Sequence, residues 1–183
     1  MTSEEKIQYP YLPEGREIHY VSADHPWMRA AREVADSHSA CSFWPTGAVV
    51  VKDGKIIGRG ANSGNCFRPI CPRVAEHCKT GEGYHLCRDL CEQDGHSEIT
   101  ATDDAMKNTA DASGADLYLY GHWWCCKPCW DRMIACGIRN IYLLENAHHV
   151  FTRENRMKLL EENQRRLERG ENIYPKDVRW TLD

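Results

Sequence analysis

The chain has 183 residues, of which 42% are hydrophobic and 27% are charged, and its formal net charge is −4. This composition is typical of one soluble globular domain, and no apolar run reaches the roughly 18 residues that a membrane-spanning helix needs. The polar, acidic start of the chain does not resemble a secretory signal, so we expect a cytoplasmic protein with no membrane partner. The negative charge argues against binding of long nucleic acid, which usually requires a basic face.

The first third of the chain predicts a helix followed by a β-hairpin. Residues 1–25 contain proline and glycine among polar residues and are expected to form a loosely ordered lead-in. Apolar residues then recur at helical spacing over residues 26–39. Two apolar, β-branched runs at 46–51 and 56–62 flank Asp53 and Gly54, and this order is a strong signal for a hairpin.

The second half of the chain alternates between helix and strand patterns. The expected elements are a helix that begins at His96 and is stopped by Gly114, a strand at 116–120, a helix at 128–136, a strand at 138–144 and a charged helix at 152–169. Residues 26–170 would form one domain and residues 171–183 a C-terminal tail. Alternating strands and helices predict an α/β fold, a three-layer α/β/α sandwich around a mixed sheet.

Two short motifs in this half carry the predicted chemistry. His96 stands two residues before Glu98, and a C-x-x-C pair follows later in the chain, formed by Cys126 and Cys129. Two thiolates and one imidazole occupy three corners of a zinc tetrahedron and leave the fourth open for water, as in catalytic zinc sites. Glu98 would carry protons beside the metal. The order H-x-E and then C-x-x-C is a zinc deaminase signature.

On these motifs the chain resembles the cytidine and deoxycytidylate deaminase family, from about Ala40 to about Glu145. The hairpin also resembles the family's, as does the asparagine that closes it. The resemblance implies hydrolytic deamination of a cytosine nucleotide, dCMP to dUMP with release of ammonia, by a homo-oligomer that binds a small-molecule nucleotide. It also implies that Asn62 contacts the sugar of the substrate and that Arg68 lies near its phosphate.

The chain departs from the family pattern beside the motifs. The family usually has proline where Cys125 stands and asparagine where Thr100 stands. The C-x-x-C spacing favours Cys126 over Cys125 as the zinc ligand. Trp123 and Trp124 precede these cysteines and could stack on a base or fill the core. The changes predict an altered pocket, so another amino-substituted heterocycle, a purine base or a modified pyrimidine, is the alternative substrate.

Residues 63–95 form a cysteine-rich insertion that is long for a loop without helix or strand signals. With no secretory signal, thiolate ligation is favoured over disulfides. A second, structural zinc would order this loop, and the resemblance implies one ligand just before the hairpin. The predicted ligands are Cys41, Cys71, Cys78 and Cys87. Free thiols that pack as small hydrophobic groups are the alternative.

The alternative function from a different class is a non-catalytic zinc module that uses its cysteine-rich loop to hold a partner. Glu98 argues against this reading, because a purely structural site has no use for a carboxylate beside an open metal position.

Overall fold

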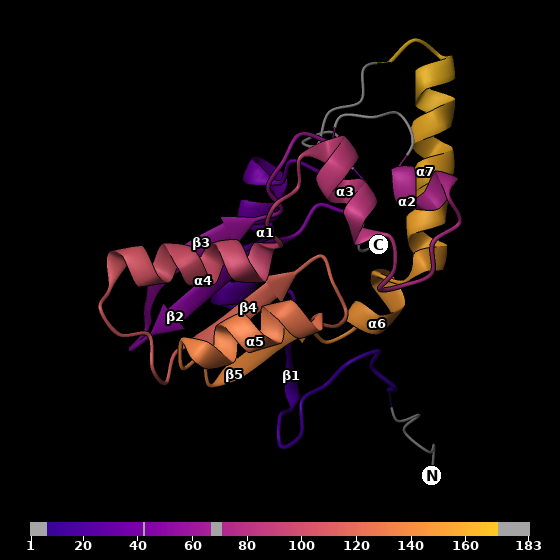
Figure 1. Ribbon diagram of the computed structural model, residues 1–183. Helices are drawn as coiled ribbons and strands as arrows, with labels where there is room; N and C mark the ends of the chain where they lie inside the picture. Colours follow the sequence, from indigo (N-terminus) through magenta and orange to yellow (C-terminus); the bar gives the residue numbers. More distant parts are fainter. Residues whose placement is uncertain (1–6, 42, 67–70, 172–183) are drawn as a thin grey trace.

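The computed structural model describes residues 7–41, 43–66 and 71–171. A five-stranded sheet in the order β1-β5-β4-β2-β3 forms its centre (Figure 1). The strands are β1 (Ile18–Val21), β2 (Gly47–Lys52), β3 (Lys55–Ala61), β4 (Asp116–Tyr120) and β5 (Asn140–Leu144). β1, β5 and β4 are parallel to one another, whereas β2 is antiparallel to both β4 and β3. The predicted mixed sheet is therefore confirmed.

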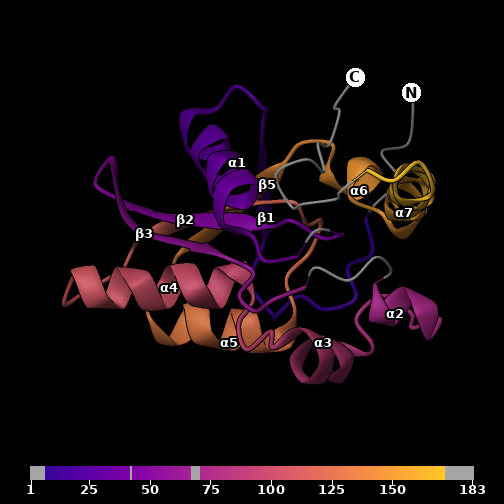
Figure 2. The same cartoon turned by 90° about the horizontal axis from the view of Figure 1, so that it is seen from above.

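Helices cover both faces of the sheet. The described helices are α1 (Pro26–His38), α2 (Pro72–Ala75), α3 (Tyr84–Cys91), α4 (Ser97–Asn108), α5 (Lys127–Ala135), α6 (Ala147–Val150) and α7 (Arg153–Glu168). α1 lies on one face, and α4 and α5 lie side by side on the other (Figure 2). This arrangement confirms the predicted α/β fold with three layers. None of the described helices combines the length and apolar character needed to cross a bilayer.

Two segments hold more regular structure than the sequence indicated. β1 lies inside the expected lead-in and pairs with β5 along its whole length, from Ile18 opposite Ile141 to Val21 opposite Leu144. Four residues are too few to show a convincing alternation, and the strand is stabilised by a partner more than 100 residues away in the chain. The cysteine-rich insertion contains α2 and α3, both too short for a clear helical period.

α4 lies directly on the hairpin, because β3 has glycine at the points of contact. A Cβ atom added to Gly58 or Gly60 would overlap the backbone of Ala101 on α4. This close approach fixes the distance between α4 and the sheet. It therefore fixes the position of His96 and Glu98, which lie at the start of that helix.

Gly60→Ala is expected to destabilise the fold by about 1–3 kcal/mol, the usual cost of overpacking, because α4 must move away from β3. Urea unfolding would measure the change. The exposed Lys55 at the start of the same strand provides the control, since Lys55→Ala should change stability by less than about 0.5 kcal/mol. A Gly60→Ala variant as stable as the wild type would show that α4 is not held at this distance.

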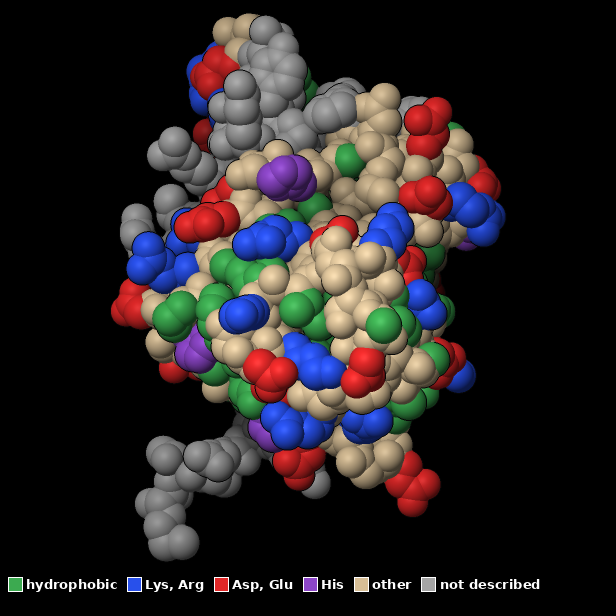
Figure 3. Space-filling view, turned by 90° about the vertical axis from the view of Figure 1, so that its left-hand side faces the viewer, with side chains coloured by type: hydrophobic (Ala, Val, Ile, Leu, Met, Phe, Trp, Pro, Cys, Tyr) green, Lys and Arg blue, Asp and Glu red, His purple; other side chains and the backbone are tan. Residues whose placement is uncertain are grey.

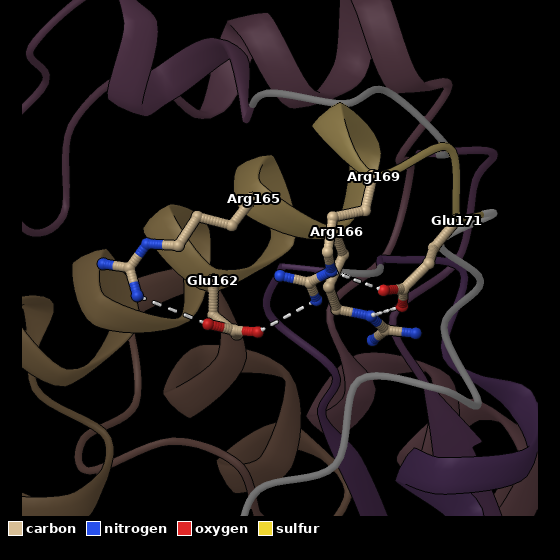
Figure 4. A network of polar contacts seen from close by, with 5 residues as sticks. All are labelled: Glu162, Arg165, Arg166, Arg169 and Glu171. Atoms are coloured by element: carbon tan, nitrogen blue, oxygen red, sulfur yellow. Dashed lines mark hydrogen bonds and ion pairs between the residues drawn. The ribbon is translucent and has the colours of Figure 1, made fainter.

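α7 is anchored by its first turns. The buried guanidinium of Arg156 donates to the carbonyl oxygens of Phe43 and Gly121 and lies 4.7 Å from the centre of the Trp44 ring. At the far end of α7, side chains that are exposed, apart from the half-buried Arg166, form an ion-pair network (Figure 4). Its members are Glu162, Arg165, Arg166, Arg169 and Glu171. Such solvent-screened surface pairs contribute little to stability, so the buried anchor dominates the placement of the helix.

Candidate active site

Three of the predicted metal ligands converge at one point. The Nδ1 atom of His96 lies 3.4 Å from the sulfur of Cys126 and 3.5 Å from that of Cys129, and the two sulfurs are 3.3 Å apart. Among the described residues this is the one group of three or more candidate ligands whose atoms all lie within 4.8 Å of one another. Zn–S bonds of about 2.3 Å and Zn–N bonds of about 2.0 Å require similar separations. The residues present therefore fit a zinc ion.

The starts of two neighbouring helices place these ligands. His96 is the N-cap of α4 and Cys126 is the N-cap of α5, and both have extended backbones that end the preceding loop. Because unpaired amides and the helix dipole favour negative charge at this end, both helices stabilise a site rich in thiolate. The two helices pack against each other on one face of the sheet, so their first turns meet.

Cys126, rather than Cys125, belongs to this group. The side-chain hydrogen bond between Cys126 and Cys129, together with the neighbouring His96, lowers the pKa of Cys126 to about 4, against the opposing effect of burial. Burial and the charge of Glu98 instead raise the pKa of Cys125 well above its usual value. Cys125 is fully buried, and its thiol donates to the Glu98 carboxylate. The residue that replaces the family's proline thus contacts the predicted proton carrier.

Glu98 lies beside the metal ligands and is only 6% exposed. Burial raises the pKa of its carboxyl group, while the charge of His96 opposes that shift. The Oγ atom of Ser97 is 3.2 Å from the carboxylate and donates to it. A carboxyl group in such a place can both accept and return a proton.

Two cavities that share lining residues border this group. The inner cavity has a volume of about 50 Å³ and is bordered by Glu98 and Asn62. The outer cavity, of about 730 Å³, begins at His96 and Cys126 and extends along α3. Tyr84 borders both. Together they resemble the sites of small ligands, in which a deep reactive end continues into a wider mouth.

Of the four residues predicted to contact the substrate, Asn62 and Trp124 border a cavity and Trp123 does not. Asn62 borders the inner cavity, but its amide already donates to the Trp44 carbonyl (3.0 Å) and accepts from the Ser97 N–H (3.3 Å). Trp124 borders both cavities. Trp123 borders neither and stacks on Tyr9 instead, with ring centres 6.4 Å apart. The fourth, Arg68, lies outside the described residues.

Sequence analysis missed two residues of the insertion that reach the site. The Tyr84 ring lies 4.9 Å from the His96 ring, and the Arg73 guanidinium lies 4.3 Å from the centre of the Tyr84 ring. Arg73 also donates through Nε to the Glu82 carbonyl oxygen at 2.7 Å. Nothing in the local sequence distinguishes either residue from an ordinary surface side chain.

His122 lies outside the insertion, in the loop between β4 and α5, and also borders the inner cavity. Burial, with nearby Arg156 and His96, lowers the pKa of His122 to about 3, so the ring is neutral. Its Nδ1 atom accepts hydrogen bonds from the N–H groups of Trp123 and Trp124. The imidazole thus fixes the loop that carries the two tryptophans.

The four cysteines predicted to hold a second zinc are not all brought together. Cys41 and Cys71 share a buried cluster with Cys66 and Cys91. Cys87 is half-buried and borders both cavities. The remaining residue, Cys78, lies against the turn at Gly83, where an added Cβ atom would overlap its sulfur.

The sequence model of the cytidine and deoxycytidylate deaminase zinc-binding region matches residues 21–145, more than half of the chain. The chain belongs to this family. It is therefore a zinc-dependent hydrolytic deaminase, and the three candidate metal ligands and Glu98 lie within the matched region. No curated protein sequence matches the chain.

Several solved structures have a similar arrangement at low identity. The dCMP deaminase of cyanophage S-TIM5 is 19% identical with a TM-score of 0.43, over 75% of this chain and 89% of that one. A Thermotoga maritima diaminohydroxyphosphoribosylaminopyrimidine deaminase/reductase is 24% identical with a TM-score of 0.41, over 75% and 33%. A Bacillus subtilis guanine deaminase is 24% identical with a TM-score of 0.31, over 54% and 48%. Similarity at these identities and TM-scores does not identify the substrate of this chain.

Proposed function

We propose that this deaminase hydrolyses dCMP to dUMP and ammonia in the cytoplasm. The observation that carries the proposal is the position of Glu98, a buried carboxyl group that borders the inner cavity beside the three metal ligands. A purely structural zinc site has no need for a proton carrier facing a cavity. The substrate would place the carbon that bears its amino group at this end.

The chain's own residues would perform the proton transfers. His96, Cys126 and Cys129 would hold the zinc ion, which would supply Lewis-acid activation of water. Glu98 takes a proton from the attacking water and delivers it to the ring nitrogen next to the carbon under attack. Glu98 then moves the remaining proton of the new hydroxyl group to the amino group, which leaves as ammonia while the C=O bond forms. The carboxylate is ionised again at the end of the cycle.

Arg73 supports an anionic substrate. Its guanidinium borders the inner cavity and is held by the Tyr84 ring and the Glu82 carbonyl. No carboxylate among the described residues forms an ion pair with it, in contrast to Arg32, Arg88 and Arg132. A fixed cation without a carboxylate partner is suited to bind phosphate. The outer cavity has room for a sugar and a phosphate group.

Arg73→Ala is expected to raise the KM for dCMP about 10- to 100-fold, which corresponds to one lost charged hydrogen bond of about 1.5–3 kcal/mol. The kcat/KM for deoxycytidine, which has no phosphate, should change by less than about threefold. Arg88→Ala is the control, since Arg88 borders the outer cavity and pairs with Asp89 at 2.9 Å, whereas Arg73 borders the inner cavity. An equal loss with both substrates would contradict phosphate recognition by Arg73.

A substrate panel tests the proposal itself. Ammonia release would be compared for dCMP, deoxycytidine, cytidine, guanine and adenine at equal enzyme concentration. We expect the highest kcat/KM for dCMP. Release from guanine or adenine but not from dCMP would overturn the proposed substrate and leave the deaminase chemistry in place.

Surface charge supports a small nucleotide over a polynucleotide. Acidic and basic side chains are interspersed on the face of the molecule shown in Figure 3, whereas a polynucleotide track requires a basic stripe. We also propose a homo-oligomer, as the family resemblance implies. Light scattering after gel filtration would measure the mass, and a 21.0 kDa species would contradict assembly.

A further inference from the structure

The indole N–H of Trp124 is a buried hydrogen-bond donor without a partner. The side chain is 4% exposed, and its Nε1 atom donates to no acceptor among the described residues. An indole nitrogen can only donate, and a buried donor that is left unpaired destabilises a protein, so most such groups in native proteins are paired. Among the described residues that border the inner cavity, the one other buried side-chain oxygen or nitrogen without a partner is Oγ1 of Thr46.

Trp124 lies on the path that a substrate ring would take. It borders the inner cavity together with Glu98, and it also borders the outer cavity. Two of the metal ligands, His96 and Cys126, border the same two cavities. A heterocycle that reaches the metal ligands and Glu98 from the outer cavity therefore lies beside Trp124.

Contacts at both ends hold the Trp124 side chain in place. Its backbone N–H donates to the Nδ1 atom of His122 at 3.4 Å, and the His122 ring meets the indole edge-on, with ring centres 5.8 Å apart. At the other end, the Cη2 atom of the indole lies against the turn at Gly81 in the insertion, where an added Cβ atom would be 3.4 Å from it. Because the indole is held in this way, its N–H has a fixed direction and a partner has to come to it.

The other polar groups at this end of the cavity make weaker demands on a ligand. The side-chain amide of Asn62 already donates to the Trp44 carbonyl and accepts from the Ser97 N–H. The hydroxyl group of Thr46 can rotate and can either donate or accept, so it suits many ligand groups. The indole of Trp124, by contrast, requires an acceptor. The inner cavity therefore favours a substrate that carries an oxygen acceptor near its reacting carbon.

We propose that Trp124 determines the base specificity of the enzyme by donating its indole N–H to a ring oxygen of the substrate. The inference rests on the orientation in the proposed function, with the carbon that bears the amino group beside Glu98. In cytosine and in guanine a carbonyl group is separated from that carbon by one ring nitrogen, whereas adenine has a C–H group there. A site built to hydrogen-bond a substrate group rejects analogues that lack it, because the protein donor then stays unpaired. Oxo-substituted rings are thus accepted and adenine is excluded.

A comparison of dCMP with its 2-thio analogue tests this role, because the sulfur that replaces the ring oxygen is a weak acceptor. We expect the wild type to favour dCMP by about 10- to 100-fold in kcat/KM. Trp124→Phe keeps an aromatic ring but removes the donor, so kcat/KM for dCMP should fall by about the same factor and that for the analogue by less than about threefold. Trp123→Phe is the matched control, since Trp123 borders neither the inner nor the outer cavity, and it should keep the wild-type ratio.

An equal loss with both substrates in Trp124→Phe would overturn the proposal, because a packing defect does not distinguish oxygen from sulfur. Equal kcat/KM values for dCMP and its 2-thio analogue in the wild type would also overturn it, even if the variant failed to fold. Release of ammonia from guanine but not from dCMP would overturn the proposed substrate and still support recognition of a ring oxygen. The same variants would then be compared on guanine and 6-thioguanine, in which sulfur replaces the corresponding oxygen.

Discussion

Glu98→Gln is expected to lower kcat for deamination of dCMP by a factor of about 10²–10⁴, the usual contribution of a positioned acid–base group. The amide has the shape of the carboxylate and can still accept from the Oγ atom of Ser97, 3.2 Å away in the wild type. It cannot take a proton from water and return it. Steady-state kinetics on dCMP, with zinc quantified on the same sample, would measure the effect.

A second glutamate variant tests whether the loss of activity is specific to Glu98. Glu145→Gln removes the same charge at an exposed position at the end of β5 and should leave kcat within about twofold of the wild type. Both variants should keep the zinc content of the wild type, because neither residue is a ligand. A Glu98→Gln enzyme that works as fast as the wild type would refute the proton-transfer role.

Cys126→Ser is expected to lose the catalytic zinc ion and, with it, all measurable deamination. Serine does not provide a thiolate, and the remaining pair, His96 and Cys129, offers only two ligands. Metal analysis and ammonia release on one preparation would show both losses. The variant should keep its fold, since the expected change is confined to the starts of α4 and α5.

Cys125→Ser is the matched control one residue earlier. Its sulfur lies outside the ligand group, so this variant should keep the catalytic zinc. Deamination should fall by no more than about tenfold, because serine can replace the thiol as a donor to Glu98. The opposite pattern, in which Cys125→Ser loses zinc and Cys126→Ser keeps it, would show that the C-x-x-C pair had been assigned in the wrong register.

The metal site could be predicted from sequence because its determinants are local. His96 and Glu98 are fixed by the first turn of one helix, and Cys126 and Cys129 by the first turn of another. Turn chemistry likewise predicted the β2–β3 hairpin. The strand and helix patterns around these motifs were strong enough to indicate the α/β fold.

Features that depend on contacts between residues far apart in the sequence could not be predicted. The strand β1, for example, is stabilised by pairing with β5. Tyr84 and Arg73 reach the site only because the insertion folds over it. Spacing along the insertion did not show that Cys66 and Cys91, rather than Cys78 and Cys87, would lie with Cys41, since the contact between them is made by tertiary packing.

Ammonia release from dCMP by one wild-type preparation, measured as isolated, after removal of zinc with a chelator and after return of zinc, tests the central claim most directly. We predict one ammonia for each dUMP formed, loss of release when the catalytic zinc is removed, and recovery with zinc but not with magnesium. Release that continues in zinc-free enzyme, or zinc-loaded enzyme that releases no ammonia from dCMP, would contradict a zinc-dependent dCMP deaminase at this site.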